Sequence, residues 1–262
     1  MNQCSPFRVA IIGCGNISWA YGNSLNTRPE KVQILGAYDI DSERTNAYTK
    51  EFGGQAYSSM EAVLEDDQIE SVINLTIHSA HAGVTAAALR AGKHVHVEKP
   101  LATNRQDGQM VVNLAEEKGL RLSASPFTFL GEGQQTVLRS IQSGQIGQVL
   151  TVYAEMNWAR IERWHSNPVP FYQRGVGPML DVGVYALTFL TSVLGRVKDV
   201  QGHAEICQPE RRSNTGESYR VTTPDQVTGF LHFDSGITAR LTASFLGFSK
   251  QVGAEFHGET GS

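Results

Sequence analysis

The sequence has few cysteines, no long apolar run and no excess of basic residues. Its three cysteines, Cys4, Cys14 and Cys207, are widely scattered, so we expect no disulfide framework. No apolar stretch approaches the roughly 20 residues that a membrane-spanning helix needs. The formal net charge of −4 argues against a nucleic-acid partner, because phosphate binding needs concentrated lysine and arginine. The sequence therefore predicts neither a nucleic-acid-binding nor a membrane protein.

The composition is typical of a globular protein, with 40% hydrophobic and 18% charged residues. A chain of 262 residues can form one or two domains with a sizeable core. The first apolar run begins near residue 9, which leaves no room for a signal peptide, so we expect a reducing, cytoplasmic location.

Residues 9–18, VAIIGCGNIS, are the most informative segment of the chain. A short apolar strand turns here into a helix that begins near Ile17, a pattern typical of a dinucleotide pyrophosphate site. Gly13 allows the tight turn, and Gly15 lets the backbone approach the phosphates, which the N-terminus of the helix favours. Ser18 replaces the third glycine of the fingerprint and weakens the match, and an ordinary strand–helix turn is the alternative. The predicted pyrophosphate contacts are Gly13, Cys14, Gly15, Asn16 and Ile17, with Cys14 as a small filler rather than a nucleophile.

An acidic residue at the end of the second strand supports this interpretation. Asp39 follows the apolar run at 32–38, about 20 residues after the glycines. Its carboxylate would accept hydrogen bonds from the ribose hydroxyls and repel a 2′-phosphate, which favours NAD over NADP. Arg44 is close enough to weaken that preference, and the alternative is that Asp39 only caps the next helix.

The first half of the chain alternates strands and helices, which predicts right-handed crossovers and a doubly wound parallel sheet. The expected strands are 9–12, 32–38, 71–77, 94–97 and 120–125, with a further short strand near residue 57. The first expected helix begins near residue 17. The others cover 42–52, 59–66, 81–91 and 104–118, and Ser59 is the expected N-cap of the helix at 59–66.

After about residue 125 the pattern changes. We expect helices at 132–143 and 182–194, and strands at 149–158, 197–207, 226–233, 237–246 and 252–257. Strands without helices between them predict an antiparallel sheet, so this half is α+β and the whole chain is α/β with two domains, 1–125 and 126–262. The chain stops directly after a strand, so we expect a fragment of a longer protein, with a short family member as the alternative.

Three blocks in this order carry a resemblance to a known family: the glycine turn, residues 91–100 (AGKHVHVEKP) and residues 175–185 (GVGPMLDVGVY). Together they resemble the Gfo/Idh/MocA oxidoreductase superfamily over nearly the whole chain. The resemblance implies a Rossmann domain followed by a substrate-binding and oligomerisation domain with an open antiparallel sheet. It also implies oxidation or reduction of a sugar, polyol or related hydroxyl with NAD(P).

Lys99 is the first catalytic candidate. It follows the end of a strand in the nucleotide-binding half, where ligands of open α/β sheets collect, and Pro100 biases it away from helix. The resemblance makes Lys99 catalytic and places it, with Glu98, at the cofactor; the alternative is a surface lysine at a turn. Thr76 and His81 match the stretch around the nicotinamide ribose in relatives, although His81 could only cap its helix.

Asp181 and Tyr185 are the other catalytic candidates, four residues apart at a predicted helix start and therefore on one face. Many members have histidine where this chain has Tyr185, and the change resembles the branch of glucose–fructose oxidoreductase and dihydrodiol dehydrogenase. A phenol has a pKa near 10, so it needs a nearby cation such as Lys99 to act as a base near neutral pH. The alternative is that Asp181 caps the helix and Tyr185 packs in the core.

A polar and aromatic stretch between a strand and the Gly175 loop could cover a substrate, with Trp158, Arg160 and Trp164 as the candidates. A solvated connecting loop is the alternative. His94 and His96 point to one face of a strand, but without a third ligand at suitable spacing we expect no metal site.

These observations predict an NAD(P)-dependent dehydrogenase or reductase that acts on a secondary alcohol or ketone of a sugar, polyol or cyclitol. The alternatives are a redox-neutral enzyme with tightly held NAD and a dinucleotide-binding sensor that is not an enzyme. The resemblance also implies a homo-oligomer, a dimer or tetramer, formed through the outer face of the antiparallel sheet.

Overall fold

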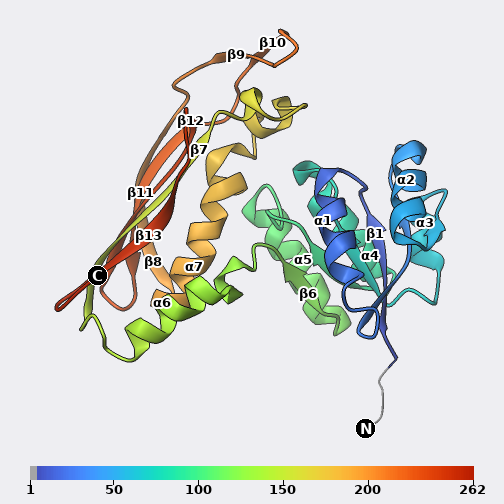
Figure 1. Cartoon of the computed structure of the whole chain (residues 1–262), viewed down its shortest axis with the longest axis horizontal. Coiled ribbons are helices and arrows are strands. Elements are labelled where there is room, and N and C mark those ends of the chain that lie inside the picture. The colour runs from blue at the N-terminus through green and yellow to red at the C-terminus, as the bar shows by residue number, and fades with distance from the viewer. Residues whose placement is uncertain (1–4) are drawn as a thin grey trace. The chain divides into compact units, whose positions relative to one another are not determined.

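The computed structural model describes residues 5–262, so Cys4 lies outside the described residues. The chain divides into two compact units, one that ends at Ser125 and one that begins at Pro126 (Figure 1). No helix among the described residues is long and apolar enough to cross a membrane.

The first unit is built on a six-stranded parallel sheet with the strand order β3-β2-β1-β4-β5-β6. Its strands are β1 (Phe7–Ile12), β2 (Val32–Tyr38), β3 (Gln55–Ala56), β4 (Ser71–Asn74), β5 (His94–Val97) and β6 (Leu122–Ala124). Its helices are α1 (Asn16–Leu25), α2 (Ser42–Phe52), α3 (Met60–Glu65), the short 3-10 turn η1 (His78–Ala80), α4 (His81–Arg90) and α5 (Arg105–Lys118). The predicted doubly wound sheet is confirmed.

Local sequence signals explain where these elements start and stop. Ser59 accepts a hydrogen bond from the backbone N–H of Ala62 at 3.1 Å, which is the predicted N-cap of α3. Asn104 caps α5 in the same way, and α5 ends at Gly119, whose φ is +64°. From Val9 to Ile12, strand β1 is buried on both faces, as a central parallel strand must be, which is why this part of its sequence is continuously apolar.

Strand β1 lies between β2 and β4, and the chain passes from one side of it to the other. This reversal of strand order is the point where the loops after neighbouring strands diverge and leave room for a ligand. The turn at residues 13–15 therefore lies at the usual ligand-binding position of such a sheet.

The second unit contains a five-stranded sheet with the order β13-β7-β12-β11-β8 and a separate hairpin. Its strands are β7 (Val149–Ala159), β8 (Val197–Glu205), β9 (Glu210–Arg212), β10 (Ser218–Arg220), β11 (Gln226–Phe233), β12 (Thr238–Gly247) and β13 (Gln251–Gly258). The expected all-antiparallel sheet is wrong at one place, because β7 and β12 pair in parallel. Parallel neighbours need a long connection. Here residues 160–237 supply it, with β8 and β11 paired within that segment.

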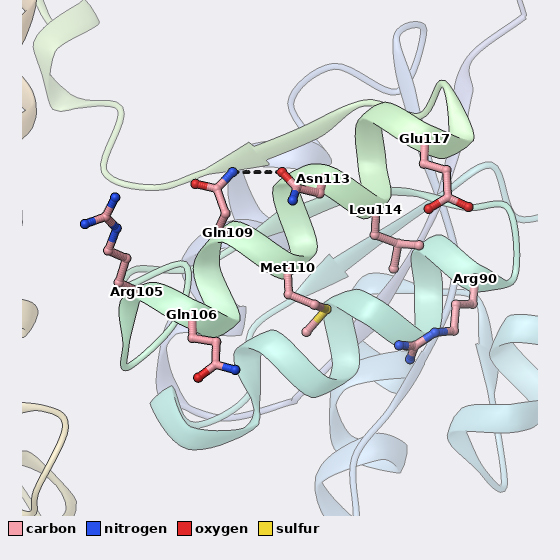
Figure 2. A pocket seen from close by; sticks show the side chains of 8 residues that line it. All are labelled: Arg90, Arg105, Gln106, Gln109, Met110, Asn113, Leu114 and Glu117. Atoms are coloured by element: carbon pink, nitrogen blue, oxygen red, sulfur yellow. Dashed lines mark hydrogen bonds between the residues drawn. The ribbon is translucent and has the colours of Figure 1, made fainter.

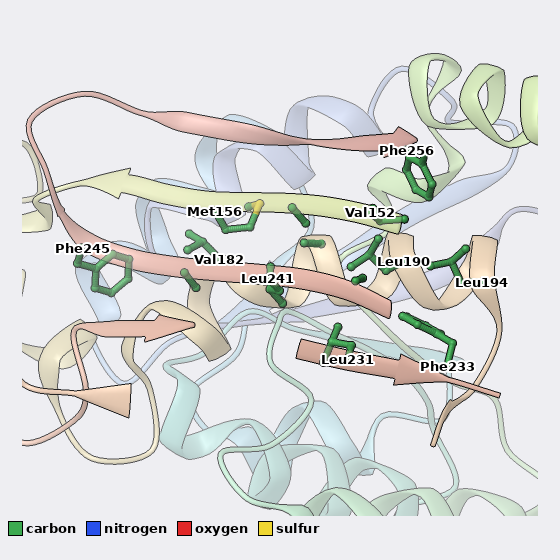
Figure 3. Packing of buried hydrophobic residues seen from close by; sticks show 14 of the residues in the cluster. Val152, Met156, Val182, Leu190, Leu194, Leu231, Phe233, Leu241, Phe245 and Phe256 are labelled. Carbon is green, nitrogen blue, oxygen red and sulfur yellow. The ribbon is translucent and has the colours of Figure 1, made fainter. Parts of the chain in front are cut away.

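The helical elements of the second unit are η2 (Thr128–Leu130), α6 (Glu132–Gln142), η3 (Ile161–Arg163), η4 (Val169–Tyr172), η5 (Met179–Gly183) and α7 (Val184–Leu194). Helix α7 lies against one face of the five-stranded sheet (Figure 1). Leu190 on α7 and Leu241 on β12 meet in a core of buried apolar side chains between helix and sheet (Figure 3). The predicted strand pattern thus places its apolar face on α7.

The helix expected at 182–194 begins with a π-helical turn, η5, before the α-helical part starts at Val184. π turns inside helices are uncommon and occur often at functional sites. Asp181 lies in this turn, so the α-helical spacing assumed for Asp181 and Tyr185 does not hold there.

A buried ion-pair network joins three segments of the second unit. Arg211, on β9 and 2% exposed, donates to Glu162 and Asp225 at 2.7 Å each. Glu162 also accepts a hydrogen bond from the Tyr172 hydroxyl at 2.5 Å. Burial would lower the pKa of Arg211, but its bonds to the two carboxylates outweigh that cost and raise the pKa, so the guanidinium stays charged. The network holds η3 and η4 against the sheet.

We expect Leu241→Ala to lower the free energy of unfolding by about 2–5 kcal/mol, because the side chain is 1% exposed and its removal leaves a cavity. Leu150→Ala is the matched control: this leucine lies on β7, is 57% exposed, and its loss should change stability by less than about 0.5 kcal/mol. Urea unfolding followed by tryptophan fluorescence measures both. Equal losses would show that the core is not where the structure places it.

Candidate active site

The glycine turn is closed by tight backbone packing. Gly13 has φ +99°, and its N–H donates to the carbonyl of Tyr38 at 2.8 Å. A Cβ on Gly13 would lie 2.6 Å from the carbonyl carbon and oxygen of Leu75. Only glycine fits both this conformation and this approach. The turn thereby joins the ends of β1, β2 and β4.

Gly15 is the N-cap of α1, and a Cβ built on it would meet no atom within 4 Å. The space in front of the helix N-terminus is therefore open. The Ser18 N–H donates to the Gly15 carbonyl at 3.1 Å, whereas the N–H groups of Asn16 and Ile17 precede the first intrahelical bond. Ser18, fully buried, donates its hydroxyl to the Gly15 carbonyl at 2.6 Å and so completes the turn without a third glycine. The donors and the open space fit the pyrophosphate of a dinucleotide.

Asp39 is tied to the glycine turn. Its carboxylate accepts hydrogen bonds from the backbone N–H groups of Cys14 at 2.7 Å and Asp41 at 2.9 Å. The N-cap of α2 is Asp41, so the alternative that Asp39 caps this helix is wrong. Each carboxylate oxygen has a second lone pair, which leaves capacity for a ribose hydroxyl. The Nε of Arg44 lies 3.3 Å from Oδ2 of Asp41, and the Arg44 side chain is 60% exposed.

Burial, reinforced by the charge of Asp39, raises the pKa of the Cys14 thiol to about 12. A thiol of this pKa is not a nucleophile at neutral pH.

Thr76 and His81 belong to one buried cluster after β4. The side chain of Asn74 accepts from the Thr76 hydroxyl at 2.7 Å and donates to the His81 carbonyl at 3.0 Å. The His81 ring lies between the carbonyls of Pro100, at 2.6 Å, and Thr76, at 3.0 Å. Burial lowers the pKa of His81, although both carbonyls oppose the shift. His81 thus links the loops after β4 and β5 rather than capping α4.

Glu98, directly after β5, is fixed by a residue of α1 and by the backbone of the residue that follows it. Its Oε1 accepts a hydrogen bond from the hydroxyl of Tyr21 on α1 at 2.8 Å, and its Oε2 accepts from the N–H of Lys99 at 2.9 Å. The Tyr21 oxygen lies 3.1 Å from Nε2 of His96 and 3.0 Å from the Ser125 hydroxyl. Burial lowers the pKa of His96, so its neutral ring is favoured near neutral pH. The Lys99–Pro100 peptide bond is cis.

In the second unit, Asp181 is 5% exposed in the π-helical turn, and Tyr185 follows in the first turn of α7. Tyr185 is partly buried and packs against the apolar core. The two side chains therefore lie at the junction of η5 and α7.

The three substrate candidates lie where β7 ends. The Nζ of Lys250 lies 3.7 Å from the ring centroid of Trp158, and Nε of Arg160 donates to the Leu246 carbonyl at 3.2 Å. Trp164 is 53% exposed and packs edge-on against His165. Lys250 and Leu246 belong to the β12–β13 region, which therefore borders the loop that follows β7.

A cavity of about 720 Å³ in the first unit lies away from these residues. Figure 2 shows that α5 provides most of its lining, with Arg90 at the end of α4. These side chains come from the helices that cover the sheet rather than from the ends of its strands, so the cavity is not the candidate active site. Within residues 5–262, no three histidine, cysteine or acidic side chains are grouped as a metal site.

Two family models match the chain in succession. Residues 7–125 match the oxidoreductase family with an NAD-binding Rossmann fold, and residues 134–262 match the GFO/IDH/MocA C-terminal domain. The chain belongs to the GFO/IDH/MocA oxidoreductase family. The resemblance stated from the three sequence blocks is therefore confirmed, and the first unit is an NAD-binding Rossmann domain.

Similar family members are sugar and diol oxidoreductases. The chain is 29% identical to dTDP-3,4-didehydro-2,6-dideoxy-alpha-D-glucose 3-reductase of Actinomadura kijaniata, over 99% of this chain and 74% of the relative. It is 27% identical to trans-1,2-dihydrobenzene-1,2-diol dehydrogenase of Bos taurus, over 90% of this chain and 68% of the relative. A solved structure of KijD10, a 3-ketoreductase from Actinomadura kijaniata, in complex with NADP and TDP-benzene matches with a TM-score of 0.80 at 28% identity, over 97% and 74% of the two chains.

The structure of this family member gathers most of the predicted first-unit residues at one end of its sheet. Hydrogen bonds connect Cys14 with Asp39, Thr76 with His81 through Asn74, and Glu98 with Lys99. Arg44 instead pairs with Asp41. Sequence reasoning missed Tyr21, which donates to Glu98, and Ser125, which contacts the Tyr21 hydroxyl. The two-residue spacing of His96, on β5, and Glu98, directly after it, could have indicated that they share a face.

Two glycine variants separate folding from cofactor binding. We expect Gly13→Ala to destabilise the protein by about 1–3 kcal/mol, because a Cβ there is strained and overlaps Leu75. Gly15→Ala should melt like the wild type without cofactor but bind NADH at least about tenfold more weakly, because its methyl group occupies the open space. Thermal melts and NADH titrations test both. Normal NADH binding by Gly15→Ala would contradict the placement of the pyrophosphate.

Proposed function

We propose that this oxidoreductase transfers a hydride between nicotinamide and a secondary alcohol or ketone of a sugar, polyol or cyclitol. The observation that carries the proposal is Lys99, placed after β5 beside a fixed Glu98, at the sheet end that carries the glycine turn. The catalytic residues are Lys99, Tyr185 and Asp181. The bound dinucleotide would accept or supply the hydride.

The protein's own groups would handle the hydroxyl proton. The Tyr185 hydroxyl takes this proton as the alcohol is oxidised and returns it in the reverse reaction. The Lys99 ammonium orients the substrate oxygen. A phenol acts as a base near neutral pH only where a cation favours its phenolate form, and Lys99 is our candidate for that cation. Asp181 positions the substrate or tunes these two groups. The family relatives named above, which act on a keto sugar and a cyclic diol, support this substrate class.

The dinucleotide would occupy the predicted contacts, with its pyrophosphate at Gly13, Cys14, Gly15, Asn16 and Ile17. Its adenosine ribose would lie at Asp39 and Arg44, and its nicotinamide ribose near Thr76, His81 and Glu98. Trp158, Arg160 and Trp164 would contact the substrate. The open space at Gly15 and the shared cluster of the loops after β4 and β5 support the cofactor part of this proposal.

We propose a cytoplasmic homo-oligomer. The sheet face opposite α7 exposes Tyr153 and Phe230, at 42% and 46%, which suits a contact with a second copy. Light scattering at micromolar concentration measures the oligomeric state, and a monomer would contradict this part of the proposal.

We expect NADH to bind more tightly than NADPH, because the Asp39 carboxylate would repel a 2′-phosphate. The 3-ketoreductase structure contains NADP, so the test shows whether this chain differs from that relative in its cofactor. Tryptophan-fluorescence titrations with the two cofactors measure the ratio. Tighter NADPH binding would contradict the preference. Binding of neither cofactor by the folded protein would contradict the oxidoreductase mechanism itself.

Lys99→Met and Tyr185→Phe should each lower kcat by roughly 10²–10⁴ while NADH still binds. A screen of sugars, polyols and cyclitols with the preferred cofactor identifies the substrate for this assay. Lys198→Met and Tyr153→Phe, at exposed positions of the second unit, are the matched controls and should keep full turnover. Unchanged turnover in the Lys99→Met/Tyr185→Phe double variant would exclude the assigned roles.

A further inference from the structure

A second cavity, of about 590 Å³, lies in the second unit between η3 and the β9–β10 hairpin. Four arginines line it, Arg160, Arg163, Arg211 and Arg212, against two glutamates, Glu162 and Glu210. We call it the arginine groove. The concentration of positive charge is notable in a chain whose formal net charge is −4.

Part of this charge is already neutralised. Arg211 is buried between Glu162 and Asp225, and Glu162 is further occupied by the Tyr172 hydroxyl. Three arginines then remain against Glu210. Among the residues that the structure describes, no carboxylate forms an ion pair with Arg160, Arg163 or Arg212. The groove therefore has more guanidinium groups than carboxylates to pair with them.

The donors are held in place before any ligand arrives. The Arg160 backbone N–H donates to the Gly247 carbonyl at 3.0 Å, and its Nε donates to the Leu246 carbonyl. The guanidinium carbons of Arg160 and Arg163 lie 4.8 and 4.9 Å from the ring centroid of Phe248. The buried Arg211 network fixes η3, which carries Arg163. Such preorganisation lowers the entropy cost of binding.

The chemistry of the lining selects the ligand class. Planar guanidinium groups bind phosphoryl oxygens through paired hydrogen bonds. Phe248 is 74% exposed, an unusual state for a phenylalanine, and offers an apolar ring beside the cations. A phosphoryl group attached to a ring-bearing organic part satisfies both features.

We propose that the arginine groove binds a phosphoryl-bearing substrate, with the phosphoryl group on Arg160, Arg163 and Arg212 and the organic part against Phe248. The identification of this ligand as the substrate rests on the proposed function, whereas the binding itself does not. The substrate is then a phosphorylated or nucleotide-linked sugar rather than a neutral polyol.

Isothermal titration calorimetry of the whole chain with UDP, uridine, inorganic phosphate and glucose tests the proposal. We expect UDP to bind at least about tenfold more tightly than uridine or glucose, with phosphate competing weakly. Arg163→Gln and Arg212→Gln should each weaken UDP binding about tenfold. Phe248→Ala should weaken UDP binding but not phosphate binding. Arg196→Gln, an exposed arginine outside the groove, is the matched control and should bind UDP normally.

Thermal melts identify any variant that fails to fold, and NADH titrations of the same variants should match the wild type. Equal affinities for UDP and uridine would contradict the proposal that the arginine groove binds a phosphoryl group. Unchanged UDP affinity in both arginine variants would contradict it as well. Phosphate binding as tight as UDP binding, with no effect of Phe248→Ala, would overturn a phosphorylated substrate in favour of the free ion.

The test separates the two proposals. Normal UDP binding without NADH binding would contradict the proposed oxidoreductase mechanism and leave the groove intact. NADH-dependent turnover of a neutral sugar without UDP binding would support the oxidoreductase mechanism and contradict the proposed ligand of the arginine groove.

Discussion

The approach of Gly13 to the backbone of Leu75 is the constraint on which the candidate cofactor site depends. It brings the end of β1 against the end of β4, and the same turn bonds to the end of β2. The position of Asp39 follows, because its carboxylate binds the N–H of Cys14 inside the turn. A side chain at residue 13 would push the end of β1 away from the end of β4. A side chain at residue 15 would occupy only the open space in front of α1 and leave the fold intact. Two neighbouring glycines thus have different physical roles, one in folding and one in access.

The second organising interaction is the Glu98 carboxylate. Tyr21 donates to one oxygen and the Lys99 backbone donates to the other, so α1 and β5 are joined by one side chain. The direction in which Lys99 leaves the strand is therefore set by the neighbouring residue as well as by Pro100. His81 extends the same arrangement, since its ring contacts Pro100 and Thr76. The lysine that we propose as catalytic has a flexible side chain, and such support of its backbone would make its position more precise.

Sequence reasoning predicted features whose causes are local. The helix at 42–52, the cap at Ser59 and the alternation in the first unit follow from apolar periodicity and capping residues within a few positions. The parallel pairing of β7 with β12 was not predicted, because it depends on how a connection of nearly 80 residues folds back. The Arg211 network was missed for the same reason: Glu162 is 49 residues away, and nothing in the local pattern marks Arg211 as buried. The candidate site divides in the same way, with the glycine turn and Lys99 marked by motifs and Tyr21 and Ser125 visible only in the fold.

The Arg211 network also explains how a polar loop after β7 can be ordered. Segment 160–175 has few buried apolar residues to hold it, so burial alone gives it little stability. The ion pairs with Glu162 and Asp225 fix it, and breaking one of them by removing a single partner would leave a buried charge, at a cost of about 3–5 kcal/mol. A loop held in this way can present Arg160 and Arg163 outward in fixed positions. The buried charges therefore organise the exposed ones, which is the physical link between the core of the second unit and the ligand that we propose for its surface.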